Sequence, residues 1–265
     1  MQKTIEVKTI TPAIAFKYLS LNKTNRGLKR FWVSELKQRM ESGQWEFNGE
    51  AIKFNEKGDL IDGQHRLTAL ISADFTTKML VIRGLSTSVF PTLDGGKRRN
   101  AADTLHVSGE HHVTALSSLL RKISQYVDTG EIRSRNVRMT NQDALDLLVK
   151  YPEARESAAF GHNFNSKFKF MTPAVASFCH YILNKVSKDD AELFFNDIGE
   201  GVNLKKGSPA LVLRDKLIFN YASANGRIPN HLWIQFIFKA WNVRRKGKLI
   251  KVLQVNQDSA FPTPI

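Results

Sequence analysis

Cysteine is almost absent from this sequence, since Cys179 is the single thiol among 265 residues. One thiol excludes a disulfide bond within the chain, and it excludes a zinc site built from several cysteines. Cys179 lies inside the apolar run 175–183, so we expect it to be buried and unreactive. The cysteine content therefore indicates a packing role.

Long hydrophobic runs are missing as well. No apolar stretch approaches the roughly 20 residues that a helix needs to cross a bilayer. Residues 1–13 do not contain the apolar core of a secretory signal. These absences predict a cytoplasmic protein without membrane contact, and the hydrophobic content of 42% is sufficient for a core.

Acidic residues are few relative to basic ones. The 25 Asp and Glu residues stand against 39 Lys and Arg residues, which gives a net charge of +14 and a pI near 9.9. Such an excess is typical of proteins that contact phosphate-rich partners, so we expect nucleic acid first and a nucleotide second. The alternative is that the charge only keeps the protein soluble.

The pattern of apolar residues divides the chain in two. Residues 3–86 alternate between strand-like and helix-like segments, which predicts a small α/β unit. Helical patterns then dominate, without a Gly/Ser-rich or Pro-rich linker. We predict an α/β domain over residues 1–105 and a mostly helical domain over residues 106–265. The expected strands are at 3–9, within 45–54, at 60–61 and at 78–84, and the expected helices are at 12–21, 31–42, 67–73, 113–127, 141–150, 173–185, 188–200, 209–225 and 230–245.

The segment LIDGQHRLTAL, residues 60–70, joins a predicted strand to a predicted helix through a polar turn. A strand end, a glycine and a helix start place backbone N–H groups and the positive end of the helix dipole at one point, which favours an anion. Arg66 can bind phosphate oxygens with its fork of donors, and His65 can donate a hydrogen bond or transfer a proton. The predicted phosphate-binding residues are therefore Gly63, Gln64, His65 and Arg66.

Asp62 is the unexpected member of this turn. A carboxylate beside a phosphate site repels the ligand unless it holds a metal, accepts a proton or caps the helix. We therefore consider Asp62 a candidate catalytic residue and metal ligand, with His65 as a second catalytic candidate. Glu50, in the strand-like segment NGEAIKF, is a further candidate that would share Mg²⁺ or divide acid and base roles with Asp62. The simpler alternative is a capping Asp62 with His65 and Arg66 on an ordinary surface.

The segment GDLIDGQHRLTAL resembles the signature of the ParB/sulfiredoxin-like superfamily, whose members carry a Gly-x-x-Arg or Gly-Cys/His-His-Arg element at a strand-to-helix turn. It is more closely similar to phage and plasmid ParB N-terminal-domain-like proteins with an Asp-Gly-Gln-His-Arg motif. The resemblance implies that fold for the first domain and a nucleotide or phosphate at the turn. Gly63, His65 and Arg66 match its phosphate-contacting positions, and Asp62 matches the acidic residue of the kinase-like version.

Two departures limit what the resemblance implies. Gln64 stands where sulfiredoxin has its reactive cysteine, which excludes that thiol chemistry. Asn25-Arg26 resembles the Asn-Pro-Arg element of partition proteins without the proline, so Arg26 is carried over as a further phosphate ligand. No partition-type helix-turn-helix is recognisable after the first domain, so centromere binding is not implied.

Two more basic segments are candidates for phosphate contacts. In DGGKRRNAAD, residues 94–103, we expect Lys97, Arg98 and Arg99 to contact phosphates and Asp94 to face Asp62 or a metal; the alternative is a solvated turn. Near the C-terminus, basic residues follow an aromatic-rich helical pattern, as in segments that bind a nucleic-acid backbone. The candidate nucleic-acid-binding residues there are Arg244, Arg245 and Lys246, with a solvated surface as the alternative.

Three functions are consistent with these observations. The first is a phage or mobile-element protein that binds nucleotide or nucleic-acid phosphate at the turn and associates with DNA. The second is a nucleotide-dependent phosphotransferase or a metal-assisted nuclease, with a nucleoside triphosphate and Mg²⁺ as cofactors. The third is a non-catalytic inhibitor or adaptor of a host protein.

Overall fold

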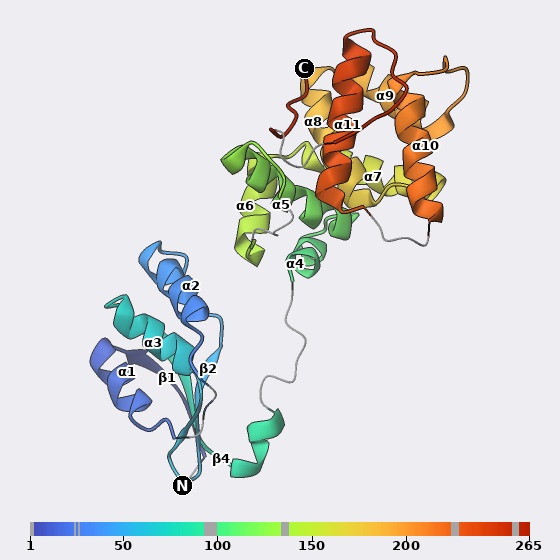
Figure 1. Ribbon diagram of the computed structural model, residues 1–265. Helices are drawn as coiled ribbons and strands as arrows, with labels where there is room; N and C mark the ends of the chain where they lie inside the picture. The colour runs from blue at the N-terminus through green and yellow to red at the C-terminus, as the bar shows by residue number, and fades with distance from the viewer. Residues whose placement is uncertain are drawn as a thin grey trace. The chain divides into compact units, whose positions relative to one another are not determined.

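The chain folds into two units, Met1–Lys97 and Arg98–Ile265 (Figure 1). The computed structural model describes residues 3–23, 25, 27–92, 100–133, 138–223, 228–255 and 260–265. The predicted fold class, a mixed α/β first part and a mostly helical remainder, is confirmed. The boundary falls ahead of the predicted residue 105, because helix α4 packs Ala101 and Leu105 into the core of the second unit.

The first unit contains a four-stranded mixed sheet among its described residues. The strand order is β1-β4-β2-β3, in which β2 and β4 are parallel and the two outer pairs are antiparallel. Parallel strands need a crossover, and α3 supplies it between β3 and β4. The elements are β1 (Thr4–Ile10), α1 (Pro12–Leu19), α2 (Arg30–Glu41), β2 (Ala51–Asn55), β3 (Leu60–Asp62), α3 (Gln64–Ser72), β4 (Thr77–Leu85) and a 3₁₀ helix, η1 (Thr87–Thr92).

The core of the first unit lies between its helices and one face of the sheet. Buried side chains from all three helices, such as Tyr18, Met40 and Leu67, pack with strand residues such as Ile52 and Phe54. Strand alternation sends the neighbouring residues to the opposite face of the sheet.

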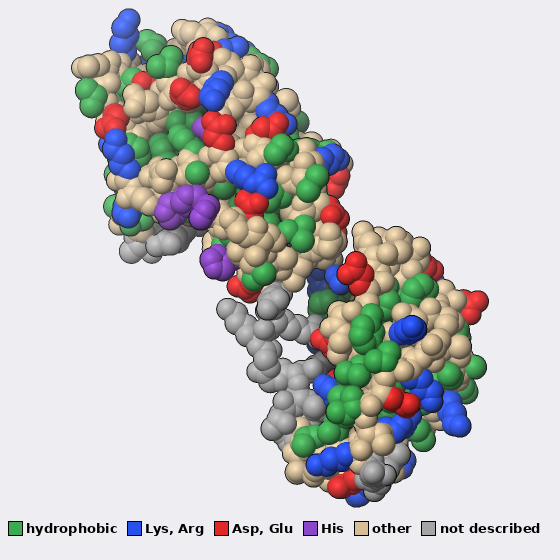
Figure 2. Space-filling model, turned by 180° about the vertical axis from the view of Figure 1, so that it is seen from behind, with side chains coloured by type: hydrophobic (Ala, Val, Ile, Leu, Met, Phe, Trp, Pro, Cys, Tyr) green, Lys and Arg blue, Asp and Glu red, His purple; other side chains and the backbone are tan. Residues whose placement is uncertain are grey.

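On this opposite face β1 exposes two apolar side chains, because Ile5 is 71% and Val7 56% exposed. Figure 2 shows hydrophobic side chains gathered on the surface of this unit.

The second unit is built from eight helices in its described residues. They are α4 (Ala101–Val107), α5 (Val113–Thr129), α6 (Asn141–Lys150), α7 (Ala154–Phe168), α8 (Pro173–Val186), α9 (Lys188–Glu200), α10 (Pro209–Ala222) and α11 (Asn230–Arg245). Several start at local capping signals, such as the capping box of Thr140 and Asp143 and the pair Thr172-Pro173. The aromatic residues of α11 lie in the core, with Trp241 fully buried. None of the described helices combines the length and the apolar character that crossing a membrane requires.

Helix α7 was not predicted from the sequence. Most of its residues are polar or small, and only a narrow stripe, which includes Ala154, Ala158 and Phe164, is buried. At Gly161 the helix passes so close to α8 that an added Cβ would lie 2.7 Å from the Pro173 carbonyl oxygen. Packing against α8 therefore stabilises a helix that composition does not favour.

Candidate functional site

The polar turn lies where β3 leaves the sheet and α3 begins. The helix starts at Gln64 and not at Leu67, so the Gln-His-Arg triplet forms its first turn. Gly63 is the N-cap, with φ of 104°, and no side chain caps the helix. Asp62 therefore does not serve as the cap. The first turn of α3 carries the positive end of the helix dipole at this point.

Gly63 is required by the packing of the turn against β2. A Cβ at position 63 would lie 2.5 Å from Cδ1 and 3.4 Å from Cα of Ile52, which is fully buried. The positive φ also disfavours any residue with a side chain. The absence of a side chain at Gly63 thus allows the backbone of the turn to approach the neighbouring strand closely.

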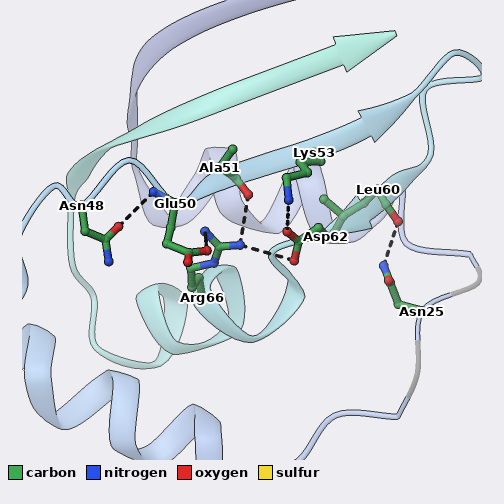
Figure 3. A network of polar contacts seen from close by, with 8 residues as sticks. All are labelled: Asn25, Asn48, Glu50, Ala51, Lys53, Leu60, Asp62 and Arg66. Atoms are coloured by element: carbon green, nitrogen blue, oxygen red, sulfur yellow. Dashed lines mark hydrogen bonds and ion pairs between the residues drawn. The ribbon is translucent and has the colours of Figure 1, made fainter. Parts of the chain in front are cut away.

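An ionic network connects Asp62 to β2 and to α3 (Figure 3). One carboxylate oxygen of Asp62 lies 3.0 Å from Nζ of Lys53, and the other lies 3.3 Å from Nη2 of Arg66. Nη2 of Arg66 also donates to the carbonyl oxygen of Ala51 at 3.0 Å. The pairing of β2 with β3 ends at Lys53 and Asp62, because the chain continues from there into α3. Ala51 lies beyond this pairing, and its carbonyl oxygen accepts a hydrogen bond from Arg66 instead.

The second guanidinium nitrogen of Arg66 is in a different situation. Nη1 lies 3.4 Å from a carboxylate oxygen of Glu50, but it is buried and has no hydrogen-bond partner. The side chain of Glu50 is 63% exposed, whereas that of Arg66 is 12% exposed. Glu50 and Asp62 therefore converge on the same guanidinium, as the sequence suggested they would on one site, but a cation lies between them.

The loop before α2 is held against the same turn. Nε2 of His65 accepts a hydrogen bond from the backbone N–H of Lys29 at 3.1 Å, so this nitrogen carries no proton in that arrangement. Oε1 of Gln64 accepts from Asn22 at 2.9 Å. Asn25 donates to the carbonyl oxygen of Leu60 at 2.8 Å (Figure 3). His65 and Gln64 thus already bind protein groups.

The remaining predicted site residues fall into two groups. Arg244 and Arg245, at the end of α11, pair with the α9 carboxylates of Asp197, at 2.8 Å, and Asp190. Lys246 follows them as the C-cap of the helix. Five predicted residues lie outside the described residues, namely Arg26, Asp94, Lys97, Arg98 and Arg99.

No group of three potential metal-ligating side chains occurs within the described ranges. The metal roles proposed for Asp62 and Asp94 stay predictions.

Lys53 is the residue of this network that the sequence analysis missed. It lies opposite Asp62 in the β2–β3 pairing, and its side chain is 24% exposed. Pairing the two strands across the turn at residues 55–59 without a bulge would place Ile52 opposite Asp62 and Lys53 one position away. A bulge next to Lys53 shifts this register, so the pair does not follow from simple counting.

Comparison with known proteins adds little to this geometry. No protein-family model matches the sequence, and no curated protein matches it. The chain is similar to a solved structure of a Pnob8-like ParB-N domain, at 12% identity over 91% of this chain and 99% of that one, with a TM-score of 0.23. At this TM-score the two structures do not superpose as a whole, so the similarity carries no argument.

Proposed function

We propose that the turn at residues 62–66 binds a phosphate group of a nucleotide or of a nucleic acid. The observation that carries this proposal is the buried Nη1 of Arg66, which has no hydrogen-bond partner beside the N-terminal end of α3. Buried donors without an acceptor are rare and unfavourable, and a phosphate oxygen is a strong acceptor for guanidinium. The positive end of the helix dipole favours the same ligand.

The ionic network suggests how each residue acts in such a site. Asp62 and the Ala51 carbonyl hold Nη2 of Arg66 and so orient the guanidinium. Glu50 is the group that a phosphate would replace, because its side chain is 63% exposed and its carboxylate lies 3.4 Å from Nη1. A phosphate oxygen displaces Glu50 from Nη1 while Asp62 keeps its place. Asp62 is then a positioning residue, and the net charge of +14 attracts the anion.

The test is a calorimetric and thermal-shift comparison of nucleoside triphosphates and short DNA, with and without Mg²⁺. Arg66→Ala should weaken the binding of the recognised ligand about 10- to 100-fold, the effect of losing a hydrogen bond to a charged group. Arg39→Ala is the matched control, because Arg39 is an α2 arginine of the same unit that pairs with Glu35. Equal losses in the two variants would contradict the proposal.

A second pair of variants keeps the test decisive if Arg66→Ala unfolds. Glu50→Gln removes the competitor of the phosphate and should tighten binding several-fold, on the order expected for one screened charge. Glu46→Gln, an exposed acid of the same loop without an ion pair among the described residues, should change binding less. Weaker binding in Glu50→Gln would refute the displacement of Glu50.

The same samples test the enzymatic alternative. A phosphotransferase or nuclease that uses Asp62 would lose turnover in Asp62→Asn while it keeps its ligand. Binding without turnover in the unmodified protein identifies a binding site.

A further inference from the structure

A group of exposed lysines without an ion pair to any described residue lies in the second unit, and it includes Lys246 from the residues that the sequence suggested. We call it the lysine patch, and it consists of Lys205, Lys206, Lys246, Lys248 and Lys251. We propose that the lysine patch binds the phosphate backbone of double-stranded DNA. This inference does not depend on the turn in the first unit.

A backbone contact brings the two halves of the lysine patch together. The N–H of Ile250 donates to the carbonyl oxygen of Gly207 at 2.8 Å, which joins the loop after α9 to the segment after α11. A Cβ at position 207 would lie 3.1 Å from the Ile250 carbonyl oxygen, and the φ of Gly207 is 83°. Exposed lysines some 40 positions apart in sequence therefore lie on neighbouring segments.

The charges of the lysine patch are available to a ligand. All five side chains belong to exposed residues, and none forms an ion pair with a described residue. Arg244 and Arg245, only a few residues earlier, are instead paired with Asp197 and Asp190 on α9. An arginine that is paired with an aspartate attracts a phosphate less strongly than a lysine without an acidic partner. The lysines are therefore the better candidates for contacts with a nucleic-acid backbone.

The side chains between the lysines favour a duplex over a single strand. Proteins that bind single strands place aromatic rings on the surface to stack on bases. The exposed large apolar side chains in the two segments that carry the lysine patch are Val202, Leu249 and Val252, which are all aliphatic. A set of point charges without stacking rings fits the sequence-independent backbone of a duplex.

The number of lysines sets how strongly duplex binding should depend on the salt concentration. If the five lysines each neutralise one phosphate, the slope of log K against log salt is about −4.5. Affinity then falls about 500-fold between 50 and 200 mM salt. Removing two of the lysines should make the slope less steep by about 1.8 and weaken binding roughly 50-fold at 0.1 M salt.

The experiment compares Lys248→Gln/Lys251→Gln with Lys167→Gln/Lys188→Gln in the full-length chain. The control removes the same charge from two exposed lysines of the second unit that pair with Glu200 and Glu156. Fluorescence anisotropy with a labelled duplex of about 20 base pairs, over a series of salt concentrations, measures both the affinity and the slope. We expect the loss of slope in the patch variant only.

Several outcomes would overturn the lysine patch as a duplex site. They are equal losses in the two double variants, absence of duplex binding by the unmodified protein at low salt, tighter binding of a single strand, or equal competition by polyglutamate. Arg66→Ala is measured in parallel. A loss of nucleotide binding there with an unchanged duplex slope separates the turn from the lysine patch.

Discussion

Replacing Gly63 by alanine should destabilise the first unit strongly. The residue has φ of 104°, a conformation that costs a residue with a Cβ about 1 to 2 kcal/mol. The new Cβ would also lie 2.5 Å from Cδ1 of Ile52, which is fully buried and has little room to move. Such overpacking typically costs about 1 to 3 kcal/mol. The sum is a loss of about 2 to 5 kcal/mol in the free energy of unfolding of this unit.

Gly58→Ala separates the two contributions. Gly58 has φ of 85° in the turn between β2 and β3, and nothing lies within 4 Å of an added Cβ. This variant should lose only the conformational part, about 1 to 2 kcal/mol. Ile52→Val deletes Cδ1, the atom that the new methyl group would strike. It costs about 0.5 to 1.5 kcal/mol by itself, but it should relieve part of the effect of Gly63→Ala.

Hydrogen exchange of the full-length chain measures these effects within the first unit alone. The slowest amides of β2 and β4 report the unfolding of the sheet. Their exchange should accelerate about 5- to 150-fold more in Gly63→Ala than in Gly58→Ala, the equivalent of the overpacking energy. Equal acceleration, or strictly additive effects of Gly63→Ala and Ile52→Val, would refute the close approach of Gly63 to β2.

Two further predictions concern the second unit. Helix propensity favours alanine over Gly161 by about 1 kcal/mol, but the Cβ would strike Ser177 and Pro173, so Gly161→Ala should instead lower the free energy of unfolding by about 2 kcal/mol or more in urea denaturation. A stabilised variant would contradict the helix crossing. Burial lowers the pKa of His180 to about 4, below its unfolded value of about 6.5. Its contribution to stability is present above pH 6.5 and is lost toward pH 4, by about 2 kcal/mol between pH 7 and pH 5. His180→Gln should remove this part of the pH dependence in urea titrations, and an unchanged dependence would show that another group titrates.

Much of the fold follows from local signals. The helix at 12–19 begins at Thr11-Pro12, and those at 141–150 and 188–200 were predicted with their observed bounds. Caps and apolar periodicity act within a few residues, so the sequence carries them directly. The mixed α/β character of the first unit follows from the same patterns. Helix α7 was missed because its stability depends on packing against α8 and not on its own composition.

The candidate site was only partly predictable. The motif located the turn, and the structure places Asp62, Gly63 and Arg66 there with Glu50 beside them. The sequence did not show that the guanidinium of Arg66 contacts Asp62, Glu50 and the Ala51 carbonyl oxygen. Its acceptor at Ala51 lies 15 residues away, across a bulged pairing of β2 and β3. Long-range pairing of this kind depends on the register, which periodicity alone does not determine.

The sequence by itself determined the positive charge, the order of strands and helices in the first unit and the position of the polar turn, because these depend on composition and on neighbours along the chain. Only the tertiary structure decided which cations are neutralised. Arg244 and Arg245 pair with aspartates 47 and 55 residues away on α9, while the lysines of two separate segments lie near each other without an ion pair to a described residue. The physical reason is that Coulomb and hydrogen-bond energies fall steeply with distance, so the distances set by packing select each partner.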